Sequence, residues 1–132
     1  MESYCQSYAG QFNVVICQND NEAAGAMTAM DNAGVTYGVG GDVILVSFDA
    51  NKPYVQMVMD GKINANFECN PMAAPTVDEI IKQIEAGETP EKEIYVTESW
   101  FAAEDNVATI TVNGEEQPMI HVTQEVLDAR PY

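Results

Sequence analysis

Three short segments of the sequence join an apolar run to polar residues that could bind a neutral solute. The runs end in Gln18-Asn19-Asp20, in Asp49-Ala50-Asn51 and in Glu68-Cys69-Asn70. An asparagine side chain offers both donors and an acceptor, whereas an ionised aspartate only accepts. Such groups suit a neutral polyol, because vicinal hydroxyls can donate to a carboxylate and exchange hydrogen bonds with an amide. Asn19 and Asp49 are therefore candidate ligand-binding residues.

The same residues also have structural explanations. Asn19 or Asp20 can cap the helix that follows, and with Asn19 as the N-cap, Glu22 occupies the N3 position of a capping box. Asp49 can open a turn. Position alone supports the structural and the ligand-binding interpretations equally.

Catalytic and metal sites are not indicated. No Ser or Cys stands in a Gly-x-Ser-x-Gly setting, the single histidine, His121, has no local partner for a triad or a zinc site, and the three cysteines lack metal-ligand spacing. The cluster Gly38–Gly41 lacks the Lys-Ser/Thr of a phosphate-binding loop. The spacing leaves open that Asp49 and Glu68 approach each other as a glycosidase pair. We expect no enzyme, no metal and no cofactor.

Composition narrows the class of partner. The chain of 132 residues has 21 acidic and five basic side chains, a net charge of −16. Phosphate backbones and anionic lipids would repel it, so we expect no nucleic acid partner and a neutral or cationic ligand. No apolar run is long enough to span a membrane. Met1–Ala9 has no basic residue and no apolar core, so any export signal is expected outside this chain.

Strand-like and helical patterns alternate along the first two thirds of the chain. Strands are predicted over 12–17, 42–49 and 63–69, and helices over 23–30, 53–60 and 75–86. Alternation of this kind predicts an α/β fold of βαβ units with a parallel sheet and right-handed crossovers. The first two strands are largely apolar, which is typical of strands buried on both faces.

The last third has a different pattern. A further strand is predicted over Glu93–Ala102. Ala108–Val112 alternates, and Asn113-Gly114 is a strong hairpin signal. We expect Met119–Val122 to be the returning strand, with Pro118 weakening the pairing at its start. The chain thus carries a C-terminal β-hairpin-like tail, to which no function is assigned.

Several of these segments resemble one family in order and spacing, over residues 13–101. These segments are the strand–QND–helix run Val14–Ala26, the V-x-F-D run Val43–Asp49, the D-G-K turn Asp60–Ala65, Glu68–Pro71, and Ala86–Glu88. They resemble the ribose/galactose-type (type I) periplasmic binding proteins, the sugar-binding proteins of bacterial ABC transporters.

The resemblance implies a two-lobed fold that holds a sugar in its cleft and captures it outside the cytoplasm for an ABC importer and its membrane permease. It also implies that Asn19 and Asp49 hydrogen-bond the sugar. The third such position falls at Cys69, where ribose binders carry glutamine. A thiol is a weak hydrogen-bonding group, so Glu68 or Asn70 would substitute, or the ligand differs. The alternative is the ligand-sensing domain of a LacI-type transcription regulator, which shares the fold.

Chains of this family are more than twice as long, so we expect a C-terminal fragment. Residues 1–70 would form the second half of the C-terminal sugar-binding lobe. Residues 71–132 would contain the hinge-crossing segment, a helix and strand of the other lobe, and the tail. The helix over 75–86 would then expose an apolar stripe with no sheet to cover it. We therefore expect a homodimer or an exchanged assembly in which a second copy covers that stripe.

Overall fold

The computed structural model describes residues 1–132, which are organised around one five-stranded mixed sheet of order β1-β2-β3-β4-β7. Its strands are β1 (Val14–Ile16), β2 (Ile44–Asp49), β3 (Ala65–Glu68), β4 (Trp100–Ala102) and β7 (Ile120–His121). The first three are mutually parallel, β4 is antiparallel to β3, and β7 is parallel to β4. The expected α/β class with a mostly parallel sheet is confirmed.

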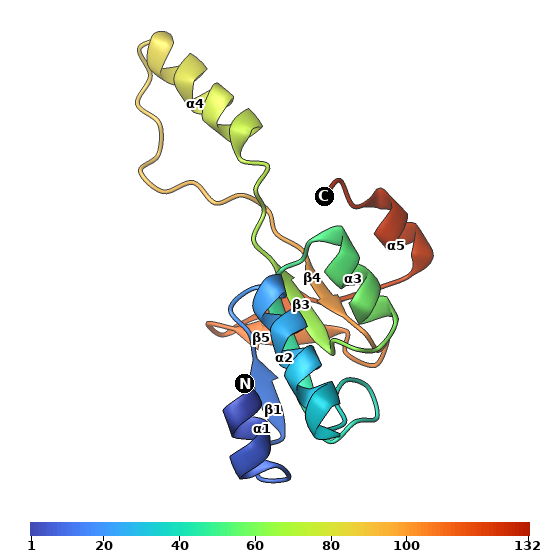
Figure 1. The fold of residues 1–132 in the computed structure, drawn as a ribbon. Helices are drawn as coiled ribbons and strands as arrows, with labels where there is room; N and C mark the ends of the chain where they lie inside the picture. The colour runs from blue at the N-terminus through green and yellow to red at the C-terminus, as the bar shows by residue number, and fades with distance from the viewer.

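Helices cover one face of this sheet (Figure 1). The crossovers α2 (Asp20–Ala33) and α3 (Lys52–Met59) follow β1 and β2, α1 (Glu2–Tyr8) contacts α2, and α5 (Gln124–Ala129) contacts α3. The predicted cap of α2 is confirmed, because Asn19 Oδ1 accepts from the Glu22 amide at 2.9 Å. Gly34, with φ of 68°, ends that helix in the left-handed conformation. No helix is both long and apolar enough to cross a bilayer.

The hydrophobic core fills the space between the sheet and these helices. Alanines on α2 let that helix approach the strands closely. The largest fully buried apolar side chains come from α2, α3, β2 and β4 and from the residues just before β2 and β3. They are Met30, Val43, Leu45, Val55, Val58, Ile63 and Phe101.

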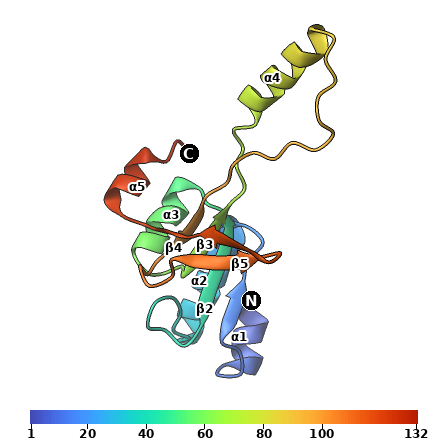
Figure 2. The same ribbon diagram turned by 180° about the vertical axis from the view of Figure 1, so that it is seen from behind.

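The opposite face of the sheet is only partly covered. Ile16 is 67% exposed and Ile44 is 49% exposed, so the expectation that the first two strands are buried on both faces is wrong. The reason is that both crossover helices lie on the same side, and the hairpin of β5 (Thr109–Val112) and β6 (Glu115–Pro118) lies across part of the other side (Figure 2). Burial on both faces needs a second helical layer.

The tail departs from the sequence prediction in two respects. Only residues 100–102 of the strand expected over 93–102 are extended in the sheet. The turn at Asn113-Gly114 is confirmed, but the returning strand is β6, whose Pro118 pairs with Thr109. The segment expected to return, residues 119–122, instead forms β7 beside β4. This pairing buries Val122 and Met119, whereas the hairpin leaves most of its side chains exposed.

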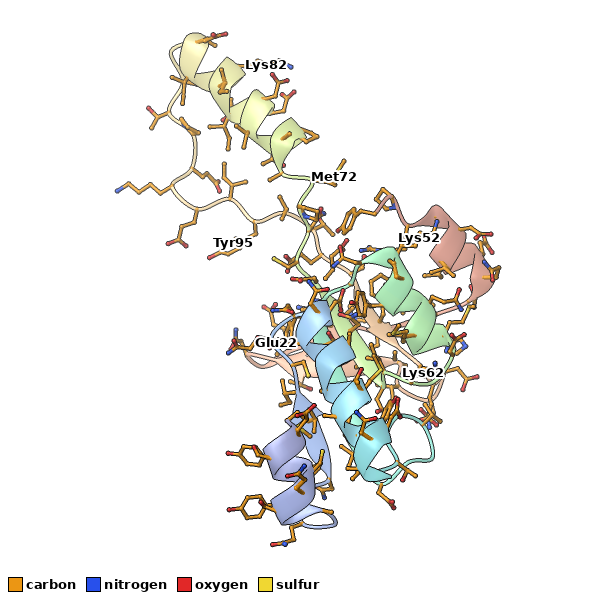
Figure 3. All side chains as sticks on the ribbon, in the orientation of Figure 1. Glu22, Lys52, Lys62, Met72, Lys82 and Tyr95 are labelled. Atoms are coloured by element: carbon orange, nitrogen blue, oxygen red, sulfur yellow. The ribbon has the colours of Figure 1, made fainter.

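Helix α4 (Ala74–Glu85) stands away from the sheet, and none of its residues is buried (Figure 1). One segment of the chain leads from the sheet to α4 through Met72, and a second segment returns from α4 through Tyr95 (Figure 3). Close to the sheet the two segments are joined by a hydrogen bond, in which Asn70 Nδ2 donates to the Thr97 carbonyl at 3.1 Å. The return of β4, β7 and α5 to the sheet of residues 1–68 was not indicated by the sequence, and the division expected near residue 70 stays a prediction.

Candidate functional site

The carboxyl ends of β1, β2 and β3 lie at one edge of the sheet, where open parallel sheets bind ligands. The register of β1 and β2 matches Ile16 with Val46, so Asn19 and Asp49 both lie three residues beyond a matched pair. Asp49 is itself paired with Glu68, and Cys69 follows. The fold therefore brings the four candidate residues, Asn19, Asp49, Glu68 and Cys69, to the ends of three adjacent strands at this edge.

Asn19 serves as a helix cap and still has hydrogen-bonding capacity left. Its Oδ1 accepts from the Glu22 amide, and the Glu22 carboxylate accepts from the Gln18 amide at 2.9 Å. The Asn19 Nδ2 has no partner within the protein, and the residue is half-buried. The structural and ligand-binding interpretations are therefore compatible, since capping uses the oxygen and leaves two N–H donors.

Asp49 combines an unpartnered carboxylate with an unusual backbone. The residue is half-buried, and no protein group donates to its side chain. Its φ is 93°, and that of the following Ala50 is 54°. Residues other than glycine are rare in this region, and each such conformation costs about 1–3 kcal/mol unless the surroundings enforce it. Strain of this kind clusters at ligand sites, which favours a binding role for Asp49.

A buried carboxylate, Asp20, holds the site from beneath. Its Oδ1 accepts from Ser47 Oγ and from Asn66 Nδ2, each at 2.8 Å. Its Oδ2 accepts from the Asn51 amide at 2.8 Å and from Asn51 Nδ2 at 3.1 Å. Asp20 is 1% exposed, so these bonds operate in a low-dielectric setting. This residue ties α2, β2, α3 and β3 together just below Asn19 and Asp49.

Glu68 is already engaged by the protein. Its Oε1 accepts from Arg130 Nη1 at 2.6 Å and from the Tyr132 hydroxyl, and its Oε2 accepts from the Ser99 amide at 2.6 Å. Burial opposes ionisation, but the hydrogen bonds from Tyr132, Arg130 and Ser99 outweigh it and lower the pKa of Glu68. With both oxygens engaged, this carboxylate is poorly placed to bind a ligand or to act with Asp49 as a catalytic pair.

The two residues after Glu68 differ in availability. Asn70 donates to the Thr97 carbonyl and accepts from the Met72 amide at 2.8 Å, so both ends of its side chain are used within the protein. Cys69 is exposed and its thiol is free. Of these two side chains, Cys69 is the one left facing solvent next to the site.

Sequence reasoning did not identify Asp20, Arg130 or Tyr132 as parts of this region. Arg130 did carry a signal, because it is the single arginine of a chain with 21 acidic residues. A planar guanidinium is the cation best suited to a buried bidentate site. Asp20 was weighed only as an alternative cap, since its buried partners lie up to 46 positions away in the chain.

The mostly parallel sheet, with its crossover helices and its polar residues at the carboxyl edge, is the arrangement of the type I periplasmic-binding-protein fold. A fructose import binding protein from Bifidobacterium longum is 30% identical over 89 residues, which are 67% of this chain and 26% of that protein. No family model matches the chain.

Solved structures of sugar-bound proteins are also similar to this chain. A protein from Mycobacterium smegmatis in complex with β-D-fucofuranose is 33% identical with a TM-score of 0.66, over 77% of this chain and 33% of that one. The periplasmic binding protein of the arabinose ABC transporter from Shewanella sp. ANA-3, bound to α and β-L-arabinofuranose, is 27% identical with a TM-score of 0.66, over 77% and 34%. The chain is therefore similar in sequence and fold to sugar-binding proteins of ABC transporters, and it spans about a third of the length of these structures and 26% of the fructose import binding protein.

Proposed function

We propose that the chain is part of an extracytoplasmic solute-binding protein that captures a sugar for an ABC importer. The observation that carries this proposal is the pairing, at one sheet edge, of free N–H donors on Asn19 with a free carboxylate on Asp49. A sugar hydroxyl can donate to the carboxylate and accept from the amide at once. The relatives named above, a fructose import protein and an arabinose transporter component, support the same role.

The proposed ligand class is a neutral sugar in its furanose form. Two of the similar structures hold furanose sugars, β-D-fucofuranose and L-arabinofuranose. The net charge of −16 and the carboxylate of Asp49 disfavour sugar phosphates and uronic acids. An anionic sugar that binds more tightly than its neutral counterpart would contradict this choice of ligand class.

The site is tested by NMR titration of the chain with fructose, arabinose and galactofuranosides, because chemical shifts detect binding even in the millimolar range. We expect shifts in the amides of Asn19 and Asp49. Asp49→Ala should abolish them, because it removes the acceptor. Asp105→Ala, at an exposed loop position without side-chain partners, is the matched control and should bind as the wild type does. Binding that survives Asp49→Ala unchanged would refute the site.

The regulator alternative is tested by the gene. The fructose import binding protein and the arabinose ABC transporter component favour transport over transcriptional regulation. An export signal or lipid-attachment motif encoded in frame with the chain would support the importer. A helix-turn-helix in the same reading frame would support the regulator instead.

A non-enzymatic role is part of the proposal. The relatives are binding proteins, and the one carboxylate that could pair with Asp49, that of Glu68, is engaged by Arg130 and Ser99. We expect no turnover of chromogenic glycosides. Hydrolysis that is lost in Asp49→Ala would contradict this part of the proposal.

Association with partners is the remaining part. In the whole protein the partner would be the membrane permease of the importer. For this chain we propose a homodimer, because the stripe of α4 leaves Val77, Ile81 and Ile84 about half exposed (50%, 49% and 57%) and the outer face of β1 is bare. Sedimentation over a concentration series should show a dimer in the wild type and a monomer in Ile81→Glu. Because each copy carries −16, added salt should strengthen the dimer. A monomer at all concentrations and salt levels would refute it.

A further inference from the structure

Two residues near the end of the chain, Arg130 and Tyr132, lie against the strand ends that form the candidate site. Arg130 Nη1 donates to Glu68 Oε1 at 2.6 Å, and Arg130 Nη2 donates to the Ala50 carbonyl at 2.5 Å. The Tyr132 hydroxyl contacts Glu68, and the Tyr132 carbonyl accepts from the Lys52 amide at 2.8 Å. The C-terminus ends above α3, on the side where β3 leaves the sheet (Figure 1).

Arg130 is held in place by more than these bonds. Its guanidinium carbon lies 5.0 Å from the centre of the Phe101 ring and 4.6 Å from that of Tyr132. The side chain is 7% exposed, so the planar group is stacked between aromatic faces and shielded from water. Such a group contributes both hydrogen bonds in a fixed geometry.

The turn that carries Asp49 is held from two sides. Asp20 accepts two hydrogen bonds from Asn51, and Arg130 donates to the carbonyl of Ala50. Both anchors lie directly after Asp49 in the chain, and Asp49 and Ala50 both have left-handed backbones. Ala50 has no side-chain group to stabilise this conformation, so it persists only where the surroundings enforce it.

We propose that Arg130 is a positioning residue for ligand binding: by joining the Ala50 carbonyl to Glu68 on the neighbouring strand, it sets the backbone that aims the Asp49 carboxylate. This inference rests on the proposed sugar site. The two terminal nitrogens of the guanidinium bond to Glu68 on β3 and to Ala50 directly after β2, so the side chain fixes the turn at Asp49 and Ala50 relative to the sheet. A lysine in its place could reach one of the two acceptors but not both in this geometry.

The test compares Arg130→Lys, which keeps the charge, with Lys62→Met, which alters an exposed cation remote from the site. We expect Arg130→Lys to weaken sugar binding about tenfold, the scale of one charge-assisted hydrogen bond. It should also abolish the NMR signature of positive φ at Asp49 and Ala50, a strong intraresidue amide-to-Hα NOE. Lys62→Met should alter neither. Arg130→Met serves as a second variant, with the same expectations for the backbone signature.

A purely structural role is separated from positioning by a double-mutant cycle. In an Asp49→Asn background, Arg130→Lys should have little further effect on affinity, because the group that it aims has lost its charge. An equal loss of affinity in both backgrounds, or retention of positive φ in Arg130→Lys, would overturn the inference. So would loss of the positive-φ signature with unchanged affinity.

The outcomes for the proposed function are distinct. If the wild type binds none of the sugars, the proposed function fails, and the backbone signature alone decides whether Arg130 sets the turn. If the wild type binds sugar through Asp49 and Arg130→Lys leaves binding and backbone intact, the function stands and the positioning role is refuted.

Discussion

Replacing Asp20 tests whether one buried carboxylate holds the strand ends together. Its two oxygens accept four hydrogen bonds, from Ser47, Asn66 and twice from Asn51. In Asp20→Ala, Asn66 Nδ2 loses its partner, and Ser47 Oγ keeps only the long hydrogen bond to the Phe48 carbonyl at 3.5 Å; both residues are 0% exposed and cannot reach water. Each such buried donor costs about 1–3 kcal/mol. Asn51 is half-buried and can bond to water instead, so the expected loss of unfolding free energy is about 4 kcal/mol.

Asp20→Asn separates the two oxygens. With its carbonyl oxygen at the Oδ1 position it keeps the bonds from Ser47 and Asn66, but it turns an N–H₂ group toward the Asn51 donors. The expected loss is smaller, about 1–2 kcal/mol. Asp105→Ala, in an exposed loop, is the control and should leave the unfolding free energy unchanged.

Urea unfolding followed by far-ultraviolet circular dichroism measures these differences, with a constant m-value as the check on two-state behaviour. Against a typical domain stability of about 5–15 kcal/mol, the Asp20→Ala effect should be plain. Equal stabilities for Asp20→Ala and Asp20→Asn, or a loss below about 1 kcal/mol in Asp20→Ala, would refute the reasoning about buried donors.

Three further predictions follow from particular residues. Although burial opposes it, hydrogen bonds from Tyr132, Arg130 and Ser99 lower the pKa of Glu68 in the folded state. The stability that Glu68 contributes is therefore present above the pKa of the unfolded carboxyl and is lost as the pH falls through the folded-state pKa. Urea unfolding at a series of acid pH values should show this loss, and Glu68→Gln should lack it. Cys69 is exposed and should react rapidly with a thiol reagent in the native protein, and more slowly when sugar is bound. Burial raises the pKa of Cys17, so that thiol should react only when the protein unfolds. Gly38→Ala should destabilise the folded protein, since φ at Gly38 is 81° and an added Cβ would lie 2.2 Å from a backbone carbonyl oxygen. Gly25→Ala, in a helix with open space around it, should stabilise the protein by about 0.5–1 kcal/mol. Thermal unfolding compares the two variants, and a Gly38→Ala protein more stable than the wild type would contradict the geometry.

Local signals predicted most of the first 70 residues correctly. The predicted cap at Asn19 acts through the backbone amide of Glu22, three residues further along the chain. Its geometry depends on a few adjacent residues, so the sequence pattern is sufficient. The same holds for the turn at Asn113-Gly114, whose residue types favour positive φ.

Long-range pairing accounts for what was missed. Pro118 was expected to weaken a strand, yet it pairs with Thr109, and its missing N–H costs nothing at the strand end. Residues 119–122 were assigned to the hairpin because they follow it, but burial of Val122 against the sheet favours β7. A contact between distant segments leaves no periodic signal in either segment.

In the candidate site, too, local features could be predicted from the sequence and long-range contacts could not. The sequence by itself determined the α/β class, the polar residues at the strand ends, and Asn19 and Asp49 as the pair to consider, because strand and cap patterns place them at one sheet edge. Only the tertiary structure decided that Glu68 is engaged by Arg130, 62 positions later in the chain, that Asp20 lies buried beneath the site, and that the turn at Asp49 is left-handed. Hydrogen bonds between distant segments depend on the packed geometry, and residue types state only which groups could form them.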